Sequence, residues 1–393
     1  ASAEFDPEAY MNATGMIRRW GYPAEKVDVI TEDGHILSMF RIRHGRAAEA
    51  NSSCRRPAVI FSHGLAADST QYIINPPESS PAFILADAGF DVFLLNHRGG
   101  TYSKRHLRLK PWDNKFWQFT MDELSMYDCP AAIDKAMEIT GEKGVYWIGH
   151  SMGTSIGYMT IANNPLYNTK IKALFQLAPS GSAGYAIGSL QFVFLYYRIM
   201  KPIVDLYRSA FGSHEAAVNV GPVYRELINL CNIIPFGPQF LYFLENMSIG
   251  KEEWMSFQSR TPVYLSHIPS GTSTWNFLHW KTARLNRGLI ELGYEGLVNV
   301  DLFVPSMQEK PPPYDYSVIN VPVYHFWSRN DYIASKEDID KTIMNTLRPE
   351  IVTSIEIPEY NHFDYPIALD VGEKVFNPIA KIVRSKEAGM CEQ

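Results

Sequence analysis

Cysteine is scarce in this sequence, with four residues among 393. The cysteines stand far apart, and none forms the Cys-x-x-Cys pair that is typical of structural metal sites. This spacing excludes a fold held together by a dense set of disulfide bonds, and it leaves the pairing of the cysteines open. The four residues are Cys54, Cys129, Cys231 and Cys391.

The sequence also lacks an excess of positive charge. Its 36 lysines and arginines are outnumbered by 42 aspartates and glutamates, and the formal net charge is -6. Proteins that bind nucleic acid usually carry a basic surface, so no nucleic-acid partner is expected. No metal-binding or cofactor-binding motif stands out either, and we expect the protein to act without a cofactor.

Long hydrophobic runs are missing as well. The longest run, near residues 192–197, is followed by Arg198 and Lys201 and stays well short of the ~20 apolar residues that a transmembrane helix needs. We therefore expect a soluble or peripheral protein. Residues 1–4 are too polar for a signal peptide, so the numbering is expected to begin at the mature residue or at an artificial junction.

The composition is otherwise that of a globular protein. Apolar residues make up 46% and charged residues 20% of the chain. Aromatic residues reach 13%, and this surplus indicates an apolar binding surface unless it serves only an aromatic-rich core. The chain exceeds the usual size of one domain, yet α/β architectures with insertions reach this length, so we expect one core domain that carries a cap.

Short hydrophobic strands alternate with helical stretches along most of the chain. Residues 27–42 predict two strands joined at Asp33-Gly34, a strong hairpin signal, and hence an antiparallel edge. The alternation that follows predicts an α/β fold with a mostly parallel central sheet and helices on both faces. We expect strands at 58–61, 91–95, 144–148, 171–177, 321–327 and 353–357, and helices at 81–88, 121–140, 151–163 and near the C-terminus.

This alternation stops at about residue 180 and resumes only after residues 311–313, which are all proline. We therefore divide the chain into a core of residues 1–180 and 314–393 and an inserted cap of residues 181–313. Within the cap, residues 211–238 are so rich in apolar side chains that exposing them to water would be costly. We interpret this segment as a lid over the functional site, or alternatively as a static cap helix whose apolar face is core.

One motif in the sequence indicates chemistry directly. Residues 149–153 form the pentapeptide Gly149-His150-Ser151-Met152-Gly153, a G-x-S-x-G motif at the point where a buried strand is expected to turn into a helix. In such a nucleophile elbow the turn is so tight that positions 149 and 153 require residues without a bulky side chain, and the serine exposes its hydroxyl. Ser151 is therefore the candidate nucleophile. The alternative is a glycine-rich turn with an incidental serine.

A serine hydroxyl is a weak nucleophile, so it needs a base within hydrogen-bond reach and a carboxylate that orients that base. In hydrolases with this elbow, the acid and then the histidine follow the serine along the chain. Asp331 and His362 fit this order, because each follows an expected strand. Asp331 could instead cap a turn, and His362 could be a buried spectator. Asp338 and Asp340 are weaker acids, since their segment resembles a helix start on a solvated face.

Acyl transfer also requires hydrogen-bond donors for the developing oxyanion. The backbone N–H of Met152, directly after the nucleophile, is one expected donor. The N–H of Leu65, in the loop that follows an early strand, is the other, although His63-Gly64 in this loop could also serve packing alone. Six other histidines lack the chain order or the loop position of the base: His63, His97, His150, His267, His279 and His325.

With these residues in place, the chain resembles the acid lipase family, the gastric and lysosomal acid lipases of animals. The resemblance runs almost end to end and implies the α/β-hydrolase fold. It also implies that Ser151, Asp331 and His362 form the triad and that Leu65 and Met152 form the oxyanion hole. The segments that carry it include Trp20-Gly-Tyr-Pro23, Thr31-Glu-Asp-Gly34, His63-Gly-Leu65, residues 83–91, Arg98-Gly99, Asp122-Glu123, Gly149-His-Ser151, Leu177-Ala-Pro179, Ser266-His267, Gly271-Thr-Ser273 and Tyr360-Asn-His362.

The resemblance further implies a serine lipase that hydrolyses the ester bonds of triacylglycerols or cholesteryl esters at acidic pH, through an acyl-enzyme on Ser151. Such an enzyme would meet its neutral lipid at an oil–water or lipoprotein surface, beneath a lid in the cap. The chain departs from the family in two places. Met152 stands where family members often have Gln after the nucleophile. This difference should be tolerated, because the oxyanion donor at this position is the backbone N–H. Cys231 matches one half of the family's cap disulfide, but residues 220–223 contain no cysteine to match the other.

Three Asn-x-Ser/Thr sites could carry N-linked glycans: Asn12, Asn51 and Asn246. Asn12 ranks first because family members carry an early site, and the resemblance implies a secreted or lysosomal glycoprotein. Two other functions stay open. One is a carboxylesterase for small soluble esters, which would lack a large apolar lid; the other is a noncatalytic lipid-binding relative, which would usually have lost a triad member. Substrate preference, acyl chain length and oligomeric state are not determined by the sequence.

Overall fold

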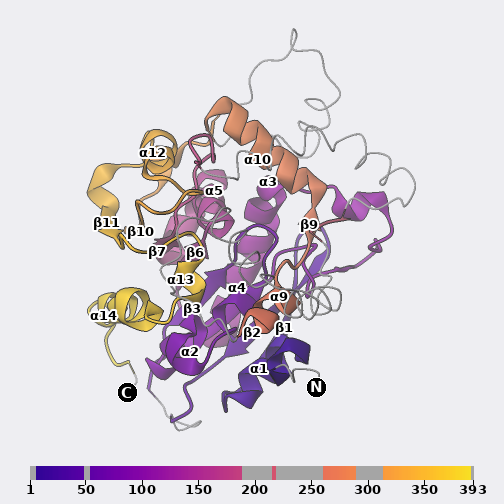
Figure 1. Ribbon diagram of the computed structural model, residues 1–393, viewed down its shortest axis with the longest axis vertical. Helices are drawn as coiled ribbons and strands as arrows, with labels where there is room; N and C mark the ends of the chain where they lie inside the picture. The colour runs from indigo at the N-terminus through magenta and orange to yellow at the C-terminus, as the bar shows by residue number, and fades with distance from the viewer. Residues whose placement is uncertain (1–5, 48–53, 188–214, 218–259, 289–312, 391–393) are drawn as a thin grey trace, which may run out of the picture.

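The computed structural model describes residues 6–47, 54–187, 215–217, 260–288 and 313–390. Its centre is a nine-stranded sheet in the order β1-β2-β4-β3-β6-β7-β10-β11, with β5 paired to β2 (Figure 1). Six neighbouring strands of this sheet run parallel, namely β4, β3, β6, β7, β10 and β11. At the other end of the sheet, β1, β2 and β5 form an antiparallel edge, where the sequence predicts a hairpin. The strands are β1 (Glu25–Ile30), β2 (His35–Ile42), β3 (Ala58–Ser62), β4 (Asp91–Leu95), β5 (Arg105–His106), β6 (Val145–His150), β7 (Ile171–Leu177), β10 (Val323–Trp327) and β11 (Val352–Glu356).

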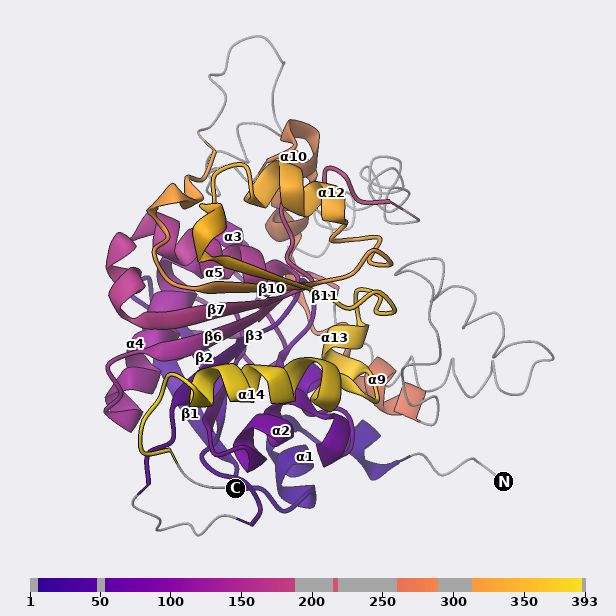
Figure 2. The ribbon, with the colours of Figure 1, turned by 90° about the vertical axis from the view of Figure 1, so that its left-hand side faces the viewer.

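Helices cover both faces of this sheet, as the sequence predicts (Figure 2). In β3, Val59 and Phe61 pack in the core beneath the first group of helices, and Ala58 and Ile60 pack in the core beneath the second. This division follows from the two-residue period of a strand. The first group is α1 (Ala13–Arg19), α2 (Pro81–Asp87) and α14 (Asn377–Arg384), and the second is α3 (Met121–Glu123), α4 (Cys129–Thr140) and α5 (Met152–Asn163).

The central strands are buried along their whole length. Every residue of β3, β4 and β6 is buried, whereas the edge strand β1 alternates between more and less exposed positions. A parallel strand that is covered on both faces has no solvent side, so it appears in the sequence as a continuous hydrophobic run. Among the helices that the structure describes, none is both long enough and apolar enough to cross a membrane.

The helix expected over residues 121–140 is interrupted. A π-helical turn at Leu124–Asp128 separates α3 from α4. Pro130 stands in the first turn of α4 and has no N–H to donate, so the regular α-helical hydrogen bonds break there and the wider turn precedes it. The helix ends at Gly141, whose φ of 70° is the left-handed conformation that glycine adopts readily.

The predicted cap is described in part. Residues 260–288 form α9 (Thr261–His267), β9 (Thr272–Ser273) and α10 (Thr274–Asn286), and β9 pairs with β8 (Glu215–Ala216). Arg260, just before α9, donates to the carbonyl oxygen of Ile74 at 2.8 Å and so ties this region to the core. The predicted lid at 211–238 lies outside the described residues, apart from residues 215–217.

Candidate active site

Ser151 lies at the turn between β6 and α5, with φ 53° and ψ -122°, a backbone conformation that non-glycine residues rarely adopt. Two glycines make room for this turn. A Cβ on Gly149 would lie 2.5 Å from the carbonyl oxygen of Gly153, and one on Gly153 would lie 2.2 Å from that of Ser62. The N–H of Ser151 donates to the Leu177 carbonyl at 3.0 Å. Residues 149–153 therefore have the geometry of a nucleophile elbow.

The structure brings the three predicted catalytic residues together. The hydroxyl of Ser151 lies 2.8 Å from Nε2 of His362, and Nδ1 of His362 lies 2.9 Å from Oδ2 of Asp331. His362 and Asp331 are buried, and both stand on loops that leave the carboxyl ends of strands, after β11 and β10 respectively. With Nδ1 donating to the carboxylate, Nε2 is free to accept the serine proton.

Asp331 also serves as the turn cap that the sequence offered as its alternative role. Its Oδ1 accepts hydrogen bonds from the N–H groups of Ile333 at 2.9 Å and Ala334 at 2.8 Å. The two roles are compatible, because an ionised carboxylate has about four lone-pair sites. The backbone bonds fix the orientation of the carboxylate toward His362.

Asp338 departs from the sequence-based expectation of a solvated helix start. It is fully buried, and its carboxylate accepts from the N–H groups of Gly181 and Ala183 at 3.1 Å and from the Ser182 hydroxyl at 3.0 Å. Burial raises the pKa of this carboxyl group. The segment at 181–185 is distant in the sequence, so the local helix pattern could not reveal it. Asp340 pairs with Lys336 at the surface, as expected.

The loop that carries Leu65 lies directly against the elbow. A Cβ on Gly64 would be 3.3 Å from Cβ of Ser151. Met152 is the first residue of α5, where a helix leaves its N–H groups without a partner in the helix. Among the described groups, no backbone carbonyl accepts from the N–H of Leu65. Within the described residues, both N–H groups therefore fit the roles expected of oxyanion donors.

Two histidines hold this loop in place. Nδ1 of His63 donates to the Gly64 carbonyl at 2.9 Å, and Nε2 of His63 accepts from the backbone N–H of His97 at 3.1 Å. The ring of His97 in turn lies 2.8 Å from the Ser62 hydroxyl. Burial lowers the pKa of His63 to about 3, with a further contribution from His97. The neutral ring that this hydrogen-bond pattern requires therefore persists in mildly acidic solution.

His150 links the elbow to the loop of His362. Its Nε2 donates to the backbone carbonyl of His362 at 2.9 Å, and the Gln71 side-chain amide approaches its Nδ1 at 3.4 Å. Burial, followed by the charge of His362, lowers the pKa of His150 to about 3. The sequence motif places His150 at the elbow but does not indicate these contacts, because Gln71 and His362 are remote along the chain.

A buried ion-pair network supports the same end of the sheet. Arg98 donates to Asp128 at 2.7 Å and to Asp33 at 2.5 Å, and Arg98 and Asp128 are both buried. The network connects the hairpin between β1 and β2 to the loop that follows β4 and to the π-helical turn before α4. Arg98 belongs to a segment shared with the acid lipase family, but no local pattern in the sequence indicates a role for it, because its partners are remote along the chain.

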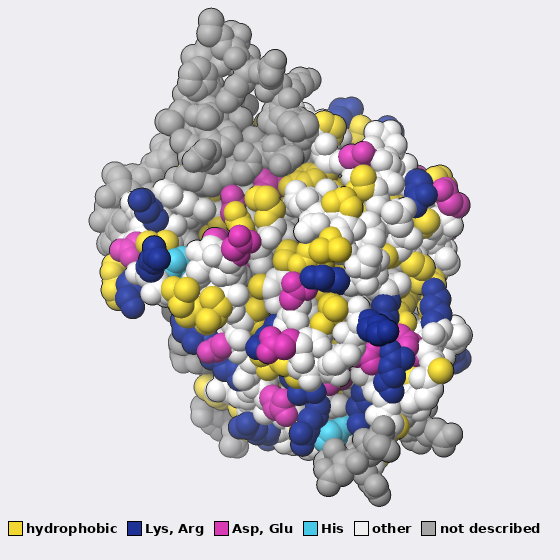
Figure 3. Space-filling view, turned by 180° about the vertical axis from the view of Figure 1, so that it is seen from behind, with side chains coloured by type: hydrophobic (Ala, Val, Ile, Leu, Met, Phe, Trp, Pro, Cys, Tyr) yellow, Lys and Arg dark blue, Asp and Glu magenta, His cyan; other side chains and the backbone are white. Residues whose placement is uncertain are grey.

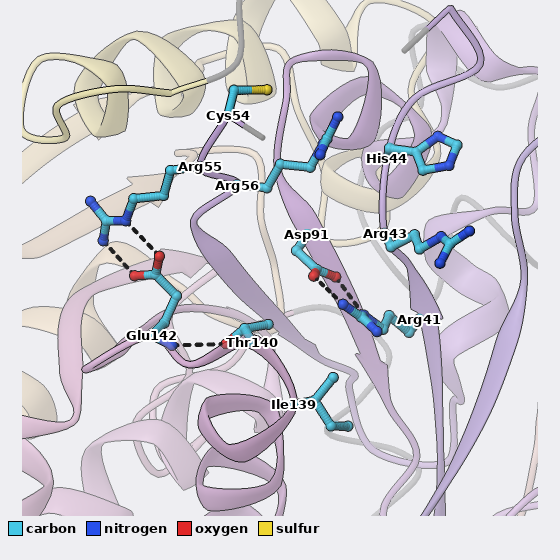
Figure 4. Close-up of a pocket in the computed structure, with 10 residues that line it drawn as sticks. All are labelled: Arg41, Arg43, His44, Cys54, Arg55, Arg56, Asp91, Ile139, Thr140 and Glu142. Atoms are coloured by element: carbon cyan, nitrogen blue, oxygen red, sulfur yellow. Dashed lines mark hydrogen bonds and ion pairs between the residues drawn. The ribbon is translucent and has the colours of Figure 1, made fainter. Parts of the chain in front are cut away.

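A separate cavity of about 320 Å³ lies at the opposite end of the sheet. Its walls include Asp91, the first residue of β4, and Glu142, just after α4. Two of the four arginines that line it are paired with carboxylates of the same cavity: Arg41 with Asp91, and Arg55 with Glu142 (Figure 4). Because the candidate triad stands at the other end of the sheet, this cavity is not the catalytic site.

The structure describes some of the other residues that the sequence analysis singled out. Asn12 is exposed at the start of α1, where its Oδ1 caps the helix by accepting from Gly15 N–H at 2.8 Å, whereas Asn51 and Asn246 lie outside the described residues. Cys54 is disulfide-bonded, and Cys129 is a buried free thiol. Within the described part of the chain, no cluster of His, Cys, Asp and Glu is arranged to hold a metal ion.

Comparisons with known protein families agree with this geometry. Residues 13–76 match the model of a partial α/β-hydrolase lipase region, and residues 57–194 match the model of the α/β-hydrolase fold. A solved structure from Sulfolobus solfataricus superposes with a TM-score of 0.55 at 15% identity, covering 93% of this chain and 99% of the other. At this identity the likeness supports the fold alone.

Relatives of closer sequence cover almost the whole chain. The human gastric triacylglycerol lipase is 36% identical over 96% of this chain and 92% of its own length. The Caenorhabditis elegans lipase lipl-1 is 35% identical over 97% of this chain and 93% of its own, and the human lipase member K is 35% identical over 95% and 91%. The chain therefore belongs to the lipase family of the α/β hydrolases that includes the gastric triacylglycerol lipases.

Proposed function

We propose that this protein is a serine lipase that hydrolyses carboxylic ester bonds of neutral lipids, with Ser151 as nucleophile, His362 as general base and Asp331 as the orienting acid. The observation that carries the proposal is the continuous chain of contacts from the Ser151 hydroxyl through His362 to the Asp331 carboxylate. The strained elbow and the adjacent N–H groups of Leu65 and Met152 complete the set of groups that acyl transfer requires.

The reaction follows from this geometry. Nε2 of His362 takes the Ser151 proton as the serine oxygen attacks the ester carbonyl, and Asp331 stabilises the imidazolium that forms. The carbonyl oxygen becomes an oxyanion, which accepts hydrogen bonds from Leu65 and Met152. His362 then protonates the departing alcohol, leaving the acyl group on the serine. A water molecule activated by the same histidine hydrolyses this acyl-enzyme and releases the fatty acid.

The substrate class is a triacylglycerol, a cholesteryl ester, or both. Relatives named as triacylglycerol lipases support the first of these, and a neutral lipid offers the ester carbonyl that the site needs. An intact Ser–His–Asp arrangement argues against a noncatalytic lipid carrier.

The domain division is part of the proposal: a core of residues 1–180 and 314–393, and a cap of residues 181–313. The hydrogen bonds from residues 181–183 to Asp338 support a fixed junction where the core leads into the cap. The disulfide bond at Cys54 supports folding in an oxidising compartment, as expected of a secreted or lysosomal protein. At Asn12, Oδ1 is used by the helix while Nδ2 remains available for a glycan.

The experiment that tests the function is a hydrolysis panel. Tributyrin, triolein and cholesteryl oleate would be compared at acidic and neutral pH, for the unaltered protein and for Ser151→Ala. We expect hydrolysis of at least one long-chain lipid by the unaltered protein and none above background by the variant. Hydrolysis of small soluble esters alone would favour the carboxylesterase, and no hydrolysis of any ester would favour the noncatalytic alternative.

A further inference from the structure

The segment between β5 and Trp117 exposes two large hydrophobic side chains. Leu107 is 60% exposed and Trp112 is 75% exposed. Single exposed apolar residues are common on protein surfaces, but an indole this open to water is unusual, because Trp is normally buried over most of its area. Here the two residues stand on the same short loop, residues 104–115.

The same loop concentrates positive charge on a chain whose net charge is -6. Five of its residues are Lys or Arg, and Asp113 is its only acidic residue. Lys104 pairs with Glu215, and Arg105 pairs with Asp28. The other three form no ion pair with any residue in the described ranges: Arg108, Lys110 and Lys115. Basic and hydrophobic side chains gather on the projection at the left of Figure 3, which lies at the right of Figure 1.

The loop is held in one shape by its own hydrogen bonds. The N–H of Lys110 donates to the Asp113 carboxylate at 2.7 Å, and the N–H of Asp113 donates back to the Lys110 carbonyl at 2.8 Å. The indole of Trp117 donates to the Pro111 carbonyl at 2.7 Å. Trp112 therefore sits at the tip of a turn that is closed on both sides, and little conformational entropy would be lost when a partner contacts it.

The loop also stands at the catalytic end of the sheet. Its β5 pairs with the first residues of β2, which lie at the carboxyl edge of the parallel strands. At the base of the loop, the N–H of Thr101 donates to the Ser270 carbonyl at 2.8 Å, and the N–H of Ser270 donates to the Ala66 carbonyl at 2.8 Å. Ala66 follows Leu65, so Ser270 connects the base of the loop to the predicted oxyanion hole.

We propose that the 104–115 loop is an interfacial anchor that docks the protein on a lipid surface bearing anionic phospholipid head groups. Trp112 and Leu107 enter the boundary between head groups and acyl chains, while Arg108, Lys110 and Lys115 pair with the phosphates. The inference rests on the proposed function, since a lipase has to reach its ester at a lipid surface. Phosphodiesters stay charged in acid, whereas carboxylates with a pKa near 4.3 lose their charge there, so phosphate is the more durable partner.

The test measures vesicle binding in the full chain carrying Ser151→Ala, so that hydrolysis does not alter the lipid. Co-sedimentation would be compared on phosphatidylcholine vesicles with and without phosphatidylglycerol. Each cation near an anionic surface contributes about fivefold in affinity, so replacing Arg108, Lys110 and Lys115 by Gln should weaken binding to the anionic vesicles about a hundredfold. Trp112→Ser should weaken binding to both kinds of vesicle about tenfold.

A matched control combines Leu166→Ser with Lys143→Gln. Leu166 is 55% exposed, and Lys143 lies at the amino end of β6, away from the carboxyl edge where the loop stands. This control should bind like the parent. Unchanged vesicle binding in both loop variants, or an equal loss in the control, would overturn the anchor. So would a loop-dependent affinity for a single-stranded oligonucleotide that exceeds the affinity for anionic vesicles.

The same loop and control substitutions in a chain with Ser151 intact separate this proposal from the proposed function. All of them should hydrolyse a dissolved short-chain ester at the parental rate, because none touches the catalytic residues. Parental activity on the dissolved ester with a selective loss on anionic emulsions supports the anchor. Activity that is absent even from the parent would refute the proposed function, whatever the vesicles show.

Discussion

His325 should make the protein less stable as the solution becomes acidic. It lies in β10, is 2% exposed, and its Nε2 lies 2.5 Å from the Tyr158 hydroxyl. Burial, assisted by the charge of Lys336, lowers the pKa of His325 to about 3. An unfolded histidine has a pKa of about 6.5. Below that pH the unfolded chain binds a proton that the folded chain excludes, so stability falls between about pH 6.5 and pH 3.

The size of this effect follows from the two pKa values. At pH 5 the solution lies about 1.5 pH units below the pKa of the unfolded histidine, so protonation favours the unfolded chain. This preference lowers the free energy of unfolding by ~2 kcal/mol. Replacing His325 by Gln keeps an acceptor for Tyr158 and removes the titration. Between pH 7 and pH 5, the free energy of unfolding should therefore fall by ~2 kcal/mol less in His325→Gln than in the parent. This expectation holds even if the variant is less stable than the parent at pH 7.

The assay is urea unfolding at the two pH values, followed by tryptophan fluorescence. Phe326→Leu is the matched control, because it weakens packing at the next buried position of β10 without changing a titratable group. It should lower stability equally at both pH values and leave the difference between them unchanged. An equal decline from pH 7 to pH 5 in the parent and in His325→Gln would refute the reasoning.

Three buried carboxyl groups act in the opposite direction to His325. Burial raises the pKa values of Glu8, Asp91 and Asp338 in the folded protein. A group whose folded pKa is raised contributes stability that is fully present below its unfolded pKa and is lost as the pH rises through the folded value. These three groups therefore offset in acid part of the destabilisation from buried histidines such as His325. Asp128 adds to that destabilisation, because, against the opposing effect of burial, the charge of Arg98 lowers its pKa to about 2.

Four further substitutions test the site and its supports. Asp331→Asn should lower kcat on a dissolved ester by about 10⁴-fold, because His362 would lose the carboxylate that holds its tautomer; a loss below tenfold would contradict this. Asp338→Asn should keep kcat within a few-fold but lower the free energy of unfolding by about 1–3 kcal/mol, since the amide cannot accept every donor; unchanged stability would argue against the junction. His150→Phe should lower kcat with little change in KM by releasing the His362 loop, and equal rates would remove its positioning role. Cys54→Ser should lower stability by about 2–4 kcal/mol, and an effect that persists under reducing conditions would contradict a disulfide origin.

The sequence predicted the parts of the molecule that depend on local pattern. Continuous hydrophobic runs marked the buried strands, and the Asp33-Gly34 turn marked the antiparallel edge. The elbow at Ser151 was readable because only glycine fits at 149 and 153, as the close approaches there explain. Asp331 and His362 followed from chain order, because each stands after a strand whose carboxyl end lies at the same edge of the sheet.

Features that depend on contacts between distant segments were not predictable. Asp338 looked solvated because its helix start is regular, and the residues that cover it lie about 155 positions earlier in the chain. The pairing of Arg98 with Asp33 and Asp128 joins three segments that no local period connects. Pro130 could have signalled the break in the 121–140 helix, because a proline there has no N–H to donate.

The claim on which the account depends is that Ser151 is the nucleophile, activated by His362. The most direct measurement is labelling with an organophosphonate, with the modified residue located by mass spectrometry and the remaining ester hydrolysis measured on the same sample. We predict a single adduct, on Ser151, whose extent matches the loss of activity, and a Ser151→Ala variant that takes no label and loses about 10⁴-fold or more in rate while keeping the parental unfolding midpoint. A folded Ser151→Ala variant that hydrolyses ester at near the parental rate, or an inactivating adduct on another residue, would contradict the claim.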